Sequence, residues 1–190
     1  MTTVKNVYEA VPEFISEKYL LRKTGPEDSA GLLKVYSDEV ALPLFNCDNC
    51  YGEDFHYTTP DRMNEAIGYW LWEYSRRGFV RWSVIDRNEA LAVGTVELFR
   101  RSADDCFDGV GLLRLDLRSD RENREDIVDI LNLIVPPAYE LFDCNRIATK
   151  AIPPAKQRIE ALLSLGFSAS DKPLIGHDGT EYGDYYQLWK

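Results

Sequence analysis

Residues 80–99 read VRWSVIDRNEALAVGTVELF, and residues 110–118 read VGLLRLDLR. The first stretch contains two runs rich in β-branched and aromatic residues, separated by the polar residues 87–89, which predicts two strands joined by a tight turn. In the second stretch, leucines alternate with charged residues, the period of a strand that buries one face. We therefore expect three consecutive strands in the middle of the chain.

Helical patterns flank these strands on both sides. Apolar residues recur at helical spacing from Met63 to Tyr74, after a Thr59-Pro60 start signal. Earlier, Thr24 and Glu27 have the spacing of a capping box that would begin another helix. A long helix is expected over 127–142. The adjacent Pro136 and Pro137 predict a kink or break in it, because proline lacks an amide donor and clashes one turn back.

The remaining segments complete an ordered series of elements. They are a strand at 19–22, a strand at 146–152, a helix at 154–165, a tight turn at Asp178-Gly179 and a strand at 185–189. Together they predict an α+β fold, with a mixed, mostly antiparallel central sheet of six or seven strands flanked by about four helices. We expect a single domain over residues 1–190, of which 1–15 form an N-terminal arm.

The overall charge limits the classes of partner. Lys and Arg number 22 and Asp and Glu 32, giving a formal net charge of −10. Such a field repels nucleic acid and anionic membranes and attracts a cationic amine or peptide. Residues 1–6 lack the apolar core of a signal peptide, and no run of about 18 apolar residues occurs. A cytoplasmic protein is therefore expected, with a homodimer left open.

Five short phrases carry a resemblance to a known family. They are Tyr19-Leu20-Leu21-Arg22, Pro26-Glu27-Asp28, Trp82-Ser83-Val84-Ile85, Gly94-Thr95-Val96-Glu97-Leu98 and Leu165-Gly166-Phe167. In this order, over residues 15–190, the chain resembles the GNAT superfamily, and particularly ribosomal-protein N-terminal acetyltransferases. The resemblance implies the GNAT fold. It also implies an acyl-CoA-dependent N-acetyltransferase, with acetyl-CoA as co-substrate and a small amine or a peptide N-terminus as acceptor.

The resemblance also implies where the cofactor would bind. In the family, the strand before the long helix is splayed and its backbone binds pantetheine, which here corresponds to Leu115 and Leu117. The following loop reads Arg/Gln-x-x-Gly-x-Gly/Ala and offers backbone amides to the pyrophosphate. The corresponding residues here are Arg121, Glu122, Asn123, Arg124, Glu125 and Asp126.

This loop departs from the family pattern. Arg124 and Asp126 stand where the family has small residues, and a carboxylate near a phosphate is unfavourable by up to about 4 kcal/mol at 4 Å. An acidic first turn also suits the helix dipole, and Ser119 and Glu122 have the spacing of a capping box. In the last helix, Arg158 stands where the family often has serine. The alternative is therefore a catalytically inactive GNAT-like binding or regulatory domain that has lost normal acetyl-CoA binding.

Two carboxylates are candidates for the base that removes a proton from the amine, namely Glu97 and Asp116. Their alternative interpretation is that of solvent-facing strand residues. Tyr139 and Tyr182 are candidate proton donors, although packing roles explain them more simply.

Cys47 and Cys50 form a CxxC motif in the loop that precedes the second helix. With His56, and with Cys106 or His177 as a fourth ligand, the motif would suit zinc, and alone it would suit redox chemistry. Two ordinary thiols are the preferred interpretation, and no metal is expected. The aromatic residues of this loop (Phe45, Tyr51, Phe55 and Tyr57) are expected to line a substrate cleft.

Overall fold

The computed structural model describes residues 6–190, which fold into a central sheet between two layers of helices. The strands are β1 (Phe14–Ile15), β2 (Tyr19–Lys23), β3 (Val80–Asp86), β4 (Leu91–Arg100), β5 (Gly111–Leu117), β6 (Arg146–Lys150), β7 (Ser168–Ala169), β8 (Leu174–Ile175), β9 (Glu181–Tyr182) and β10 (Tyr185–Trp189). The helices are α1 (Ser29–Tyr36), α2 (Pro60–Ser75), α3 (Arg124–Leu141) and α4 (Lys156–Ser164). Three 3₁₀ turns accompany them: η1 (Pro26–Asp28), η2 (Leu42–Leu44) and η3 (Ser119–Arg121).

The main sheet has eight strands in the order β1-β2-β3-β4-β5-β6-β10-β7, and β8 and β9 pair separately as a hairpin around the predicted turn. All pairings are antiparallel except that of β5 with β6. The predicted fold class and the four helices are confirmed. The sheet exceeds the predicted six or seven strands because β1 and β7 are two-residue strands, too short to give a periodic signal.

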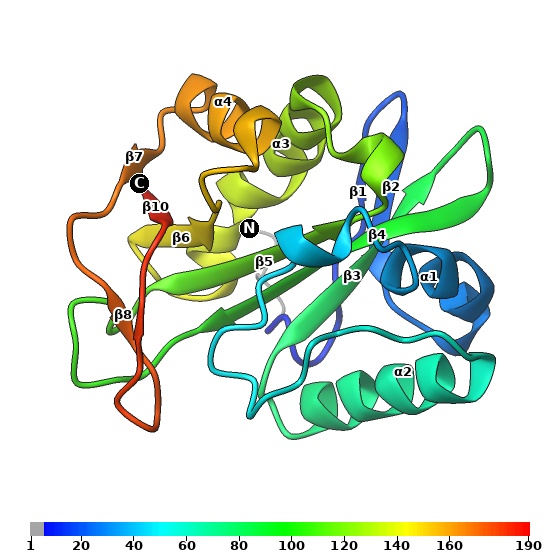
Figure 1. The fold of residues 1–190 in the computed structure, drawn as a ribbon, viewed down its shortest axis with the longest axis horizontal. Helices are drawn as coiled ribbons and strands as arrows, with labels where there is room; N and C mark the ends of the chain where they lie inside the picture. The colour runs from blue at the N-terminus through cyan, green and yellow to red at the C-terminus, as the bar shows by residue number, and fades with distance from the viewer. Residues whose placement is uncertain (1–5) are drawn as a thin grey trace.

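Helices cover both faces of the sheet (Figure 1), and each face carries its own apolar core. Leu113, Leu115 and Leu117 pack with apolar residues of α3 and α4, whereas α1 and α2 form the other core. Because successive strand residues point to opposite faces, Arg114 and Asp116 face the α1–α2 side. That face is covered as well, and every residue of β5 is buried.

A splay between β5 and β6 is the feature of the sheet that matters most for the site. The two strands pair only through Gly111–Leu113 and Ile147–Thr149, and then they separate. On its other side β5 continues to pair with β4 as far as Leu117. This separation agrees with the splayed strand that the resemblance implied, and we use the word groove for the region between the last residues of β5 and the segment that follows β6.

Helix α3 runs without a break from Arg124 to Leu141, with both prolines inside it, so the predicted break is wrong. The carbonyls that lose their partners belong to Asn132 and Leu133, one turn earlier. Asn132 and Pro136 are exposed, so water can satisfy the freed carbonyl of Asn132. Buried residues such as Ile134 and Ala138 hold the helix against the sheet on either side of the prolines.

The two predicted helix starts have different outcomes. Thr59 caps α2 as predicted, accepting a hydrogen bond from the Arg62 amide at 3.3 Å. The box predicted from Thr24 and Glu27 is wrong, because the Gly25 amide donates to Asp28 Oδ2 at 3.0 Å instead. Asp28 prevails because its buried carboxylate also accepts a 2.7 Å hydrogen bond from Ser83 on β3.

The predicted N-terminal arm lies partly outside the described residues, which begin at residue 6. Its last two residues form β1, and Val7 is buried in the core on the α3 side. Across residues 6–190, no helix is both long and apolar enough to cross a bilayer.

Candidate functional site

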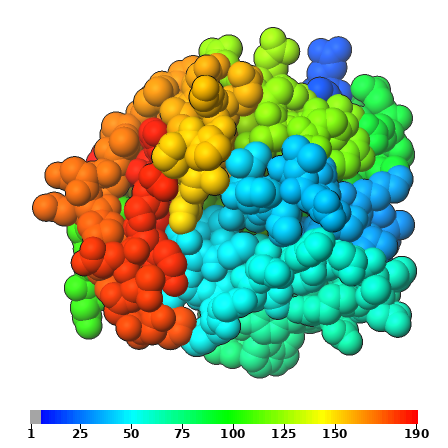
Figure 2. All heavy atoms as spheres, in the orientation of Figure 1, coloured from blue at the N-terminus to red at the C-terminus, as the bar shows by residue number. Residues whose placement is uncertain are grey.

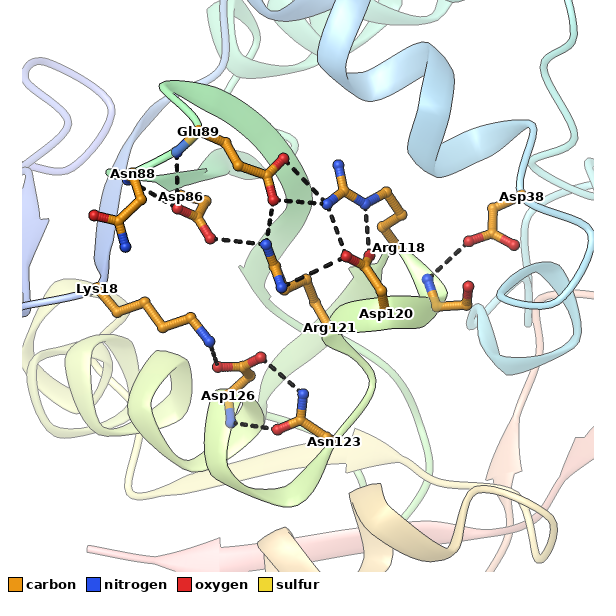
Figure 3. A network of polar contacts seen from close by, with 11 residues as sticks. Lys18, Asp38, Asp86, Asn88, Glu89, Arg118, Asp120, Arg121, Asn123 and Asp126 are labelled. Carbon is orange, nitrogen blue, oxygen red and sulfur yellow. Dashed lines mark hydrogen bonds and ion pairs between the residues drawn. The ribbon is translucent and has the colours of Figure 1, made fainter.

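The loop between β5 and α3 follows the strand as the resemblance implies, and several of its amides are bonded within the chain (Figure 3). The Ser119 amide donates to Asp38 Oδ2 at 2.8 Å, and the Asp126 amide donates to Asn123 Oδ1 at 3.0 Å. The Arg124 amide donates to Gln157 Oε1 at 3.1 Å. A phosphate cradle needs free amides at a helix N-terminus, and these three already have acceptors.

Asn123 is the N-cap of α3, so the predicted Ser119–Glu122 box is wrong. The Glu122 amide instead donates to the Ser119 carbonyl at 3.2 Å, which closes the turn η3. Three residues, 120–122, therefore separate Ser119 from the N-cap Asn123. The acidic first turn is as predicted, with Glu125 and Asp126 beside the amide end of the helix.

The basic side chains of this loop form ion pairs inside the molecule (Figure 3). Arg121, which the resemblance assigns to the phosphate, contacts Asp86 at 3.0 Å and also Glu89, both at the β3–β4 turn. Arg118 also contacts Glu89, at 3.0 Å. Asp126 pairs with Lys18 from the loop before β2. These contacts leave Arg124 as the exposed arginine of the loop, with no partner among the described residues.

Arg158 on α4 reaches into the groove and pairs with Glu122. Its Nε and Nη2 each donate to a different Glu122 oxygen at 2.7 Å, and its Nη1 donates to the Leu44 carbonyl at 3.2 Å. The two side chains are only 2% and 8% exposed. The sequence identified Arg158 as a departure from the family, but nothing in the local pattern indicated its partner.

These residues do not fit acetyl-CoA. Several of the amides are engaged, the small residues of the cradle are replaced by Arg124 and Asp126, and the Glu122 carboxylate is held in the groove. The pantetheine candidates Leu115 and Leu117 lie on β5 beyond its pairing with β6, and their side chains are in the core on the α3 side.

The two candidate bases are brought together by buried arginines. Glu97 and Asp116 are 1% and 0% exposed, so the solvent-facing interpretation of both is wrong. Arg81 pairs with Glu97 and lies 3.5 Å from Asp116 Oδ2, while Arg114 donates to Glu97 Oε1 at 2.7 Å. Tyr36 donates to Asp116 Oδ2 at 2.8 Å. Strand alternation places these groups on one face, but the helices that cover this face come from elsewhere in the chain.

The two carboxylates have opposite electrostatic environments. Burial would raise the pKa of Glu97, but Arg81 and Arg114 outweigh it and hold the pKa below its usual value. Burial raises the pKa of Asp116, and Arg81 and Tyr36 offset this only in part. Asp116 Oδ1 is buried without a hydrogen-bond partner. Both oxygens of Glu97 are therefore occupied by arginines, whereas Asp116 keeps one oxygen without a partner.

A cleft of about 750 Å³ opens beside this cluster, between residues 49–57, α2 and the start of β3. Glu97, Arg81 and Arg114 lie at its base, and aromatic residues line its walls: Tyr51, Phe55, Tyr57, Tyr69, Trp70 and Phe79. Three of the four loop aromatics thus lie where they were expected. Phe45 does not, because it packs on Tyr36 with ring centroids 5.3 Å apart.

The other candidate groups have structural roles. Burial raises the pKa of Cys47 to about 12 and that of Cys50 to about 11, which favours unreactive thiols. Within residues 6–190, no three His, Cys, Asp or Glu side chains cluster as metal ligands. Tyr139 donates to the Leu188 carbonyl at 3.2 Å, in the core. Tyr182 lies in the β8–β9 hairpin.

Solved structures similar to this fold are acetyltransferases, although no protein-family model and no curated protein matches the chain. A putative ribosomal-protein-serine acetyltransferase from Vibrio cholerae superposes with a TM-score of 0.70 at 11% identity, over 95% of this chain and 98% of that one. The ribosomal-protein-S5-alanine acetyltransferase from Vibrio fischeri gives 0.68 at 17% identity, over 94% and 96%. RimL, a ribosomal L7/L12 α-N-protein acetyltransferase solved with coenzyme A, gives 0.69 at 11%, over 94% and 98%. The chain has the fold of the GNAT acetyltransferases.

Proposed function

We propose that this chain is a GNAT-fold binding domain that does not use acetyl-CoA, the second of the two functions expected from the sequence. The Arg158–Glu122 pair carries the proposal. Its carboxylate is buried, is paired through both oxygens, and belongs to the loop to which the resemblance assigns pyrophosphate binding. Binding a phosphate there would require separating this pair and freeing amides that already have acceptors.

The cleft beneath residues 49–57 is the proposed binding site. Its aromatic walls suit a small organic ligand or a peptide segment. The net charge of −10 favours a cationic one, such as an amine. Ribosomal-protein acetyltransferases among the similar structures are consistent with a peptide ligand.

Calorimetry with acetyl-CoA at millimolar concentration tests the proposal. We expect no heat of binding and no thermal shift, together with no free-thiol release when acetyl-CoA is mixed with a panel of amines and N-terminal peptides. Saturable binding of acetyl-CoA would overturn the proposal.

An acyl-CoA-dependent N-acetyltransferase is the second candidate, and Asp116 favours it. Asp116 lies on β5 beyond the last residue that pairs with β6. Its raised pKa and its unpartnered Oδ1 suit a base that accepts a proton from an amine. This candidate requires turnover that Asp116→Asn abolishes. Glu97→Gln is the comparison, since both Glu97 oxygens already accept from arginines.

A further inference from the structure

Residues 38–48, which we call the strap, connect the end of α1 to the turn containing Cys47 and Cys50. Within the strap lies η2, and Ala41 and Phe45 are buried against the α1–α2 core. In Figure 2 the cyan strap lies directly against the yellow and orange residues of the β6–α4 region. Its polar residues make contacts along the splay of the sheet, from one end to the other.

Asp48 bridges the two strands at the point where they separate. The last paired residues are Leu113 and Thr149, so the first residues beyond the pairing are Arg114 on β5 and Lys150 on β6. Lys150 Nζ contacts Asp48 Oδ1 at 2.7 Å and Oδ2 at 2.6 Å, while Arg114 Nη2 donates to the Asp48 carbonyl at 2.9 Å. One strap residue thus takes a hydrogen bond from each strand.

Two further contacts fasten the strap to the other walls of the groove. The Leu44 carbonyl accepts from Arg158 on α4, whose remaining nitrogens hold Glu122. Asp38 accepts a hydrogen bond from the Ser119 amide in the loop after β5. Burial would raise the pKa of Asp38, but this hydrogen bond and those from the Ala41 and Val40 amides lower it. The strap therefore contacts β5, β6, α4 and the loop before α3.

We propose that the strap is an internal occupant of the groove between β5 and β6, and that the groove becomes accessible only when two ties are released, that of Asp48 to Lys150 and that of the Leu44 carbonyl to Arg158. The inference rests on the proposed function, since a groove that accepted acetyl-CoA freely could not be closed in this way. It goes further by naming the segment that closes the groove and the side chains that hold it. A charged residue at each end gives the closure a defined point of release.

Native-state amide hydrogen exchange, followed on peptides covering 38–48 and 114–117, tests the strap directly. Amides inside the strap, including those of Leu42 and Leu44, are hydrogen-bonded and can report its closure. Asp48→Asn removes the charge that pairs with Lys150, and Arg158→Gln removes the guanidinium that donates to the Leu44 carbonyl. We expect exchange in both peptides to rise about tenfold or more, with exchange in β3 and β4 unchanged.

The exposed pair Arg100–Asp143 supplies matched controls. Its N···O distance is 2.9 Å, and Arg100→Gln and Asp143→Asn make the same chemical changes on the surface. These two variants should leave strap exchange within about twofold of the wild type. If Arg158→Gln does not fold, Asp48→Asn still decides the question.

Unchanged strap exchange in a folded Asp48→Asn protein overturns the strap proposal, and so does a wild-type strap that exchanges as fast as an unprotected peptide. Neither result affects the proposed function, which calorimetry with acetyl-CoA on the wild type decides. Acetyl-CoA that binds the wild type would overturn the proposed function and, with it, the strap proposal.

Discussion

Arg158 and Glu122, 36 residues apart in the sequence, form a bidentate ion pair with two N···O distances of 2.7 Å inside the groove of the sheet. Arg158 stands where the family often has serine, whereas Glu122 occupies a variable position of the loop pattern, and each compensates the buried charge of the other. A phosphate ligand would present the same kind of acceptor to Arg158 that Glu122 provides. The pair therefore joins the loop after β5 to α4 through a residue that departs from the family pattern.

Removing one partner of this pair should strongly destabilise the protein. Arg158→Ala leaves the Glu122 carboxylate buried and unpaired, and we expect the free energy of unfolding to fall by about 3–5 kcal/mol in urea denaturation. Arg100→Ala, at an exposed pair, should cost less than about 1 kcal/mol. Equal losses in the two variants would show that the Arg158 pair is not specially buried.

The acid limb of the stability curve should depend on Glu97. Its folded-state pKa is lowered, so its ion pairs stabilise the protein at neutral pH, and this contribution is lost as pH falls through the folded pKa. We expect Glu97→Gln to be less stable than the wild type at pH 7. The two proteins should converge toward acid pH, as measured by urea unfolding between pH 7 and 3. A constant difference across this range would contradict the assignment.

Asp116 should behave in the opposite way. Its folded-state pKa is raised above the unfolded-state pKa. Ionisation of Asp116 therefore lowers the free energy of unfolding as pH rises from the unfolded-state pKa through the folded-state pKa. Asp116→Asn removes this penalty and retains an oxygen for the Tyr36 hydroxyl. At pH 7 we therefore expect it to lose at least about 2 kcal/mol less than Glu97→Gln in the same urea experiment. A greater loss in Asp116→Asn would show that the charged form is needed.

The four thiols should differ in their rates of reaction with a disulfide reagent. Cys106 is exposed, whereas burial raises the pKa values of Cys47, Cys50 and Cys144. Because the thiolate is the reactive form, we expect one fast thiol at pH 8 that Cys106→Ser removes, and three slow ones. A second fast thiol would indicate that the turn at Cys47 and Cys50 opens readily.

Periodicity accounts for the elements that were predicted correctly. The alternation in β5 and the helical spacing in α2 are repeated signals, and several residues of each agree. The break expected in α3 was wrong because packing on both sides of Pro136 and Pro137 outweighs a local penalty. The capping box moved by one residue because Asp28 also bonds to Ser83, 55 residues away.

The site was less predictable because its contacts join distant segments. Arg114 and Asp116 were placed on the correct face, but whether that face meets water depends on α1, α2 and the strap. Glu97 pairs with Arg81 and Arg114, which lie on neighbouring strands. Glu122 pairs with Arg158, and no local spacing relates these two residues. The sequence identified which residues were exceptional, and only the fold showed how they compensate one another.

The strap is part of the same covalent chain as the groove that it closes, and this sets how the closure responds to concentration. A tethered segment acts at an effective concentration that can reach the millimolar range, whatever the amount of protein present. Dilution or dialysis removes a bound small molecule but cannot remove a segment of the same chain. Any diffusible ligand for the groove must therefore compete with a neighbour that is always present, so its apparent affinity is weakened by the stability of the closed form.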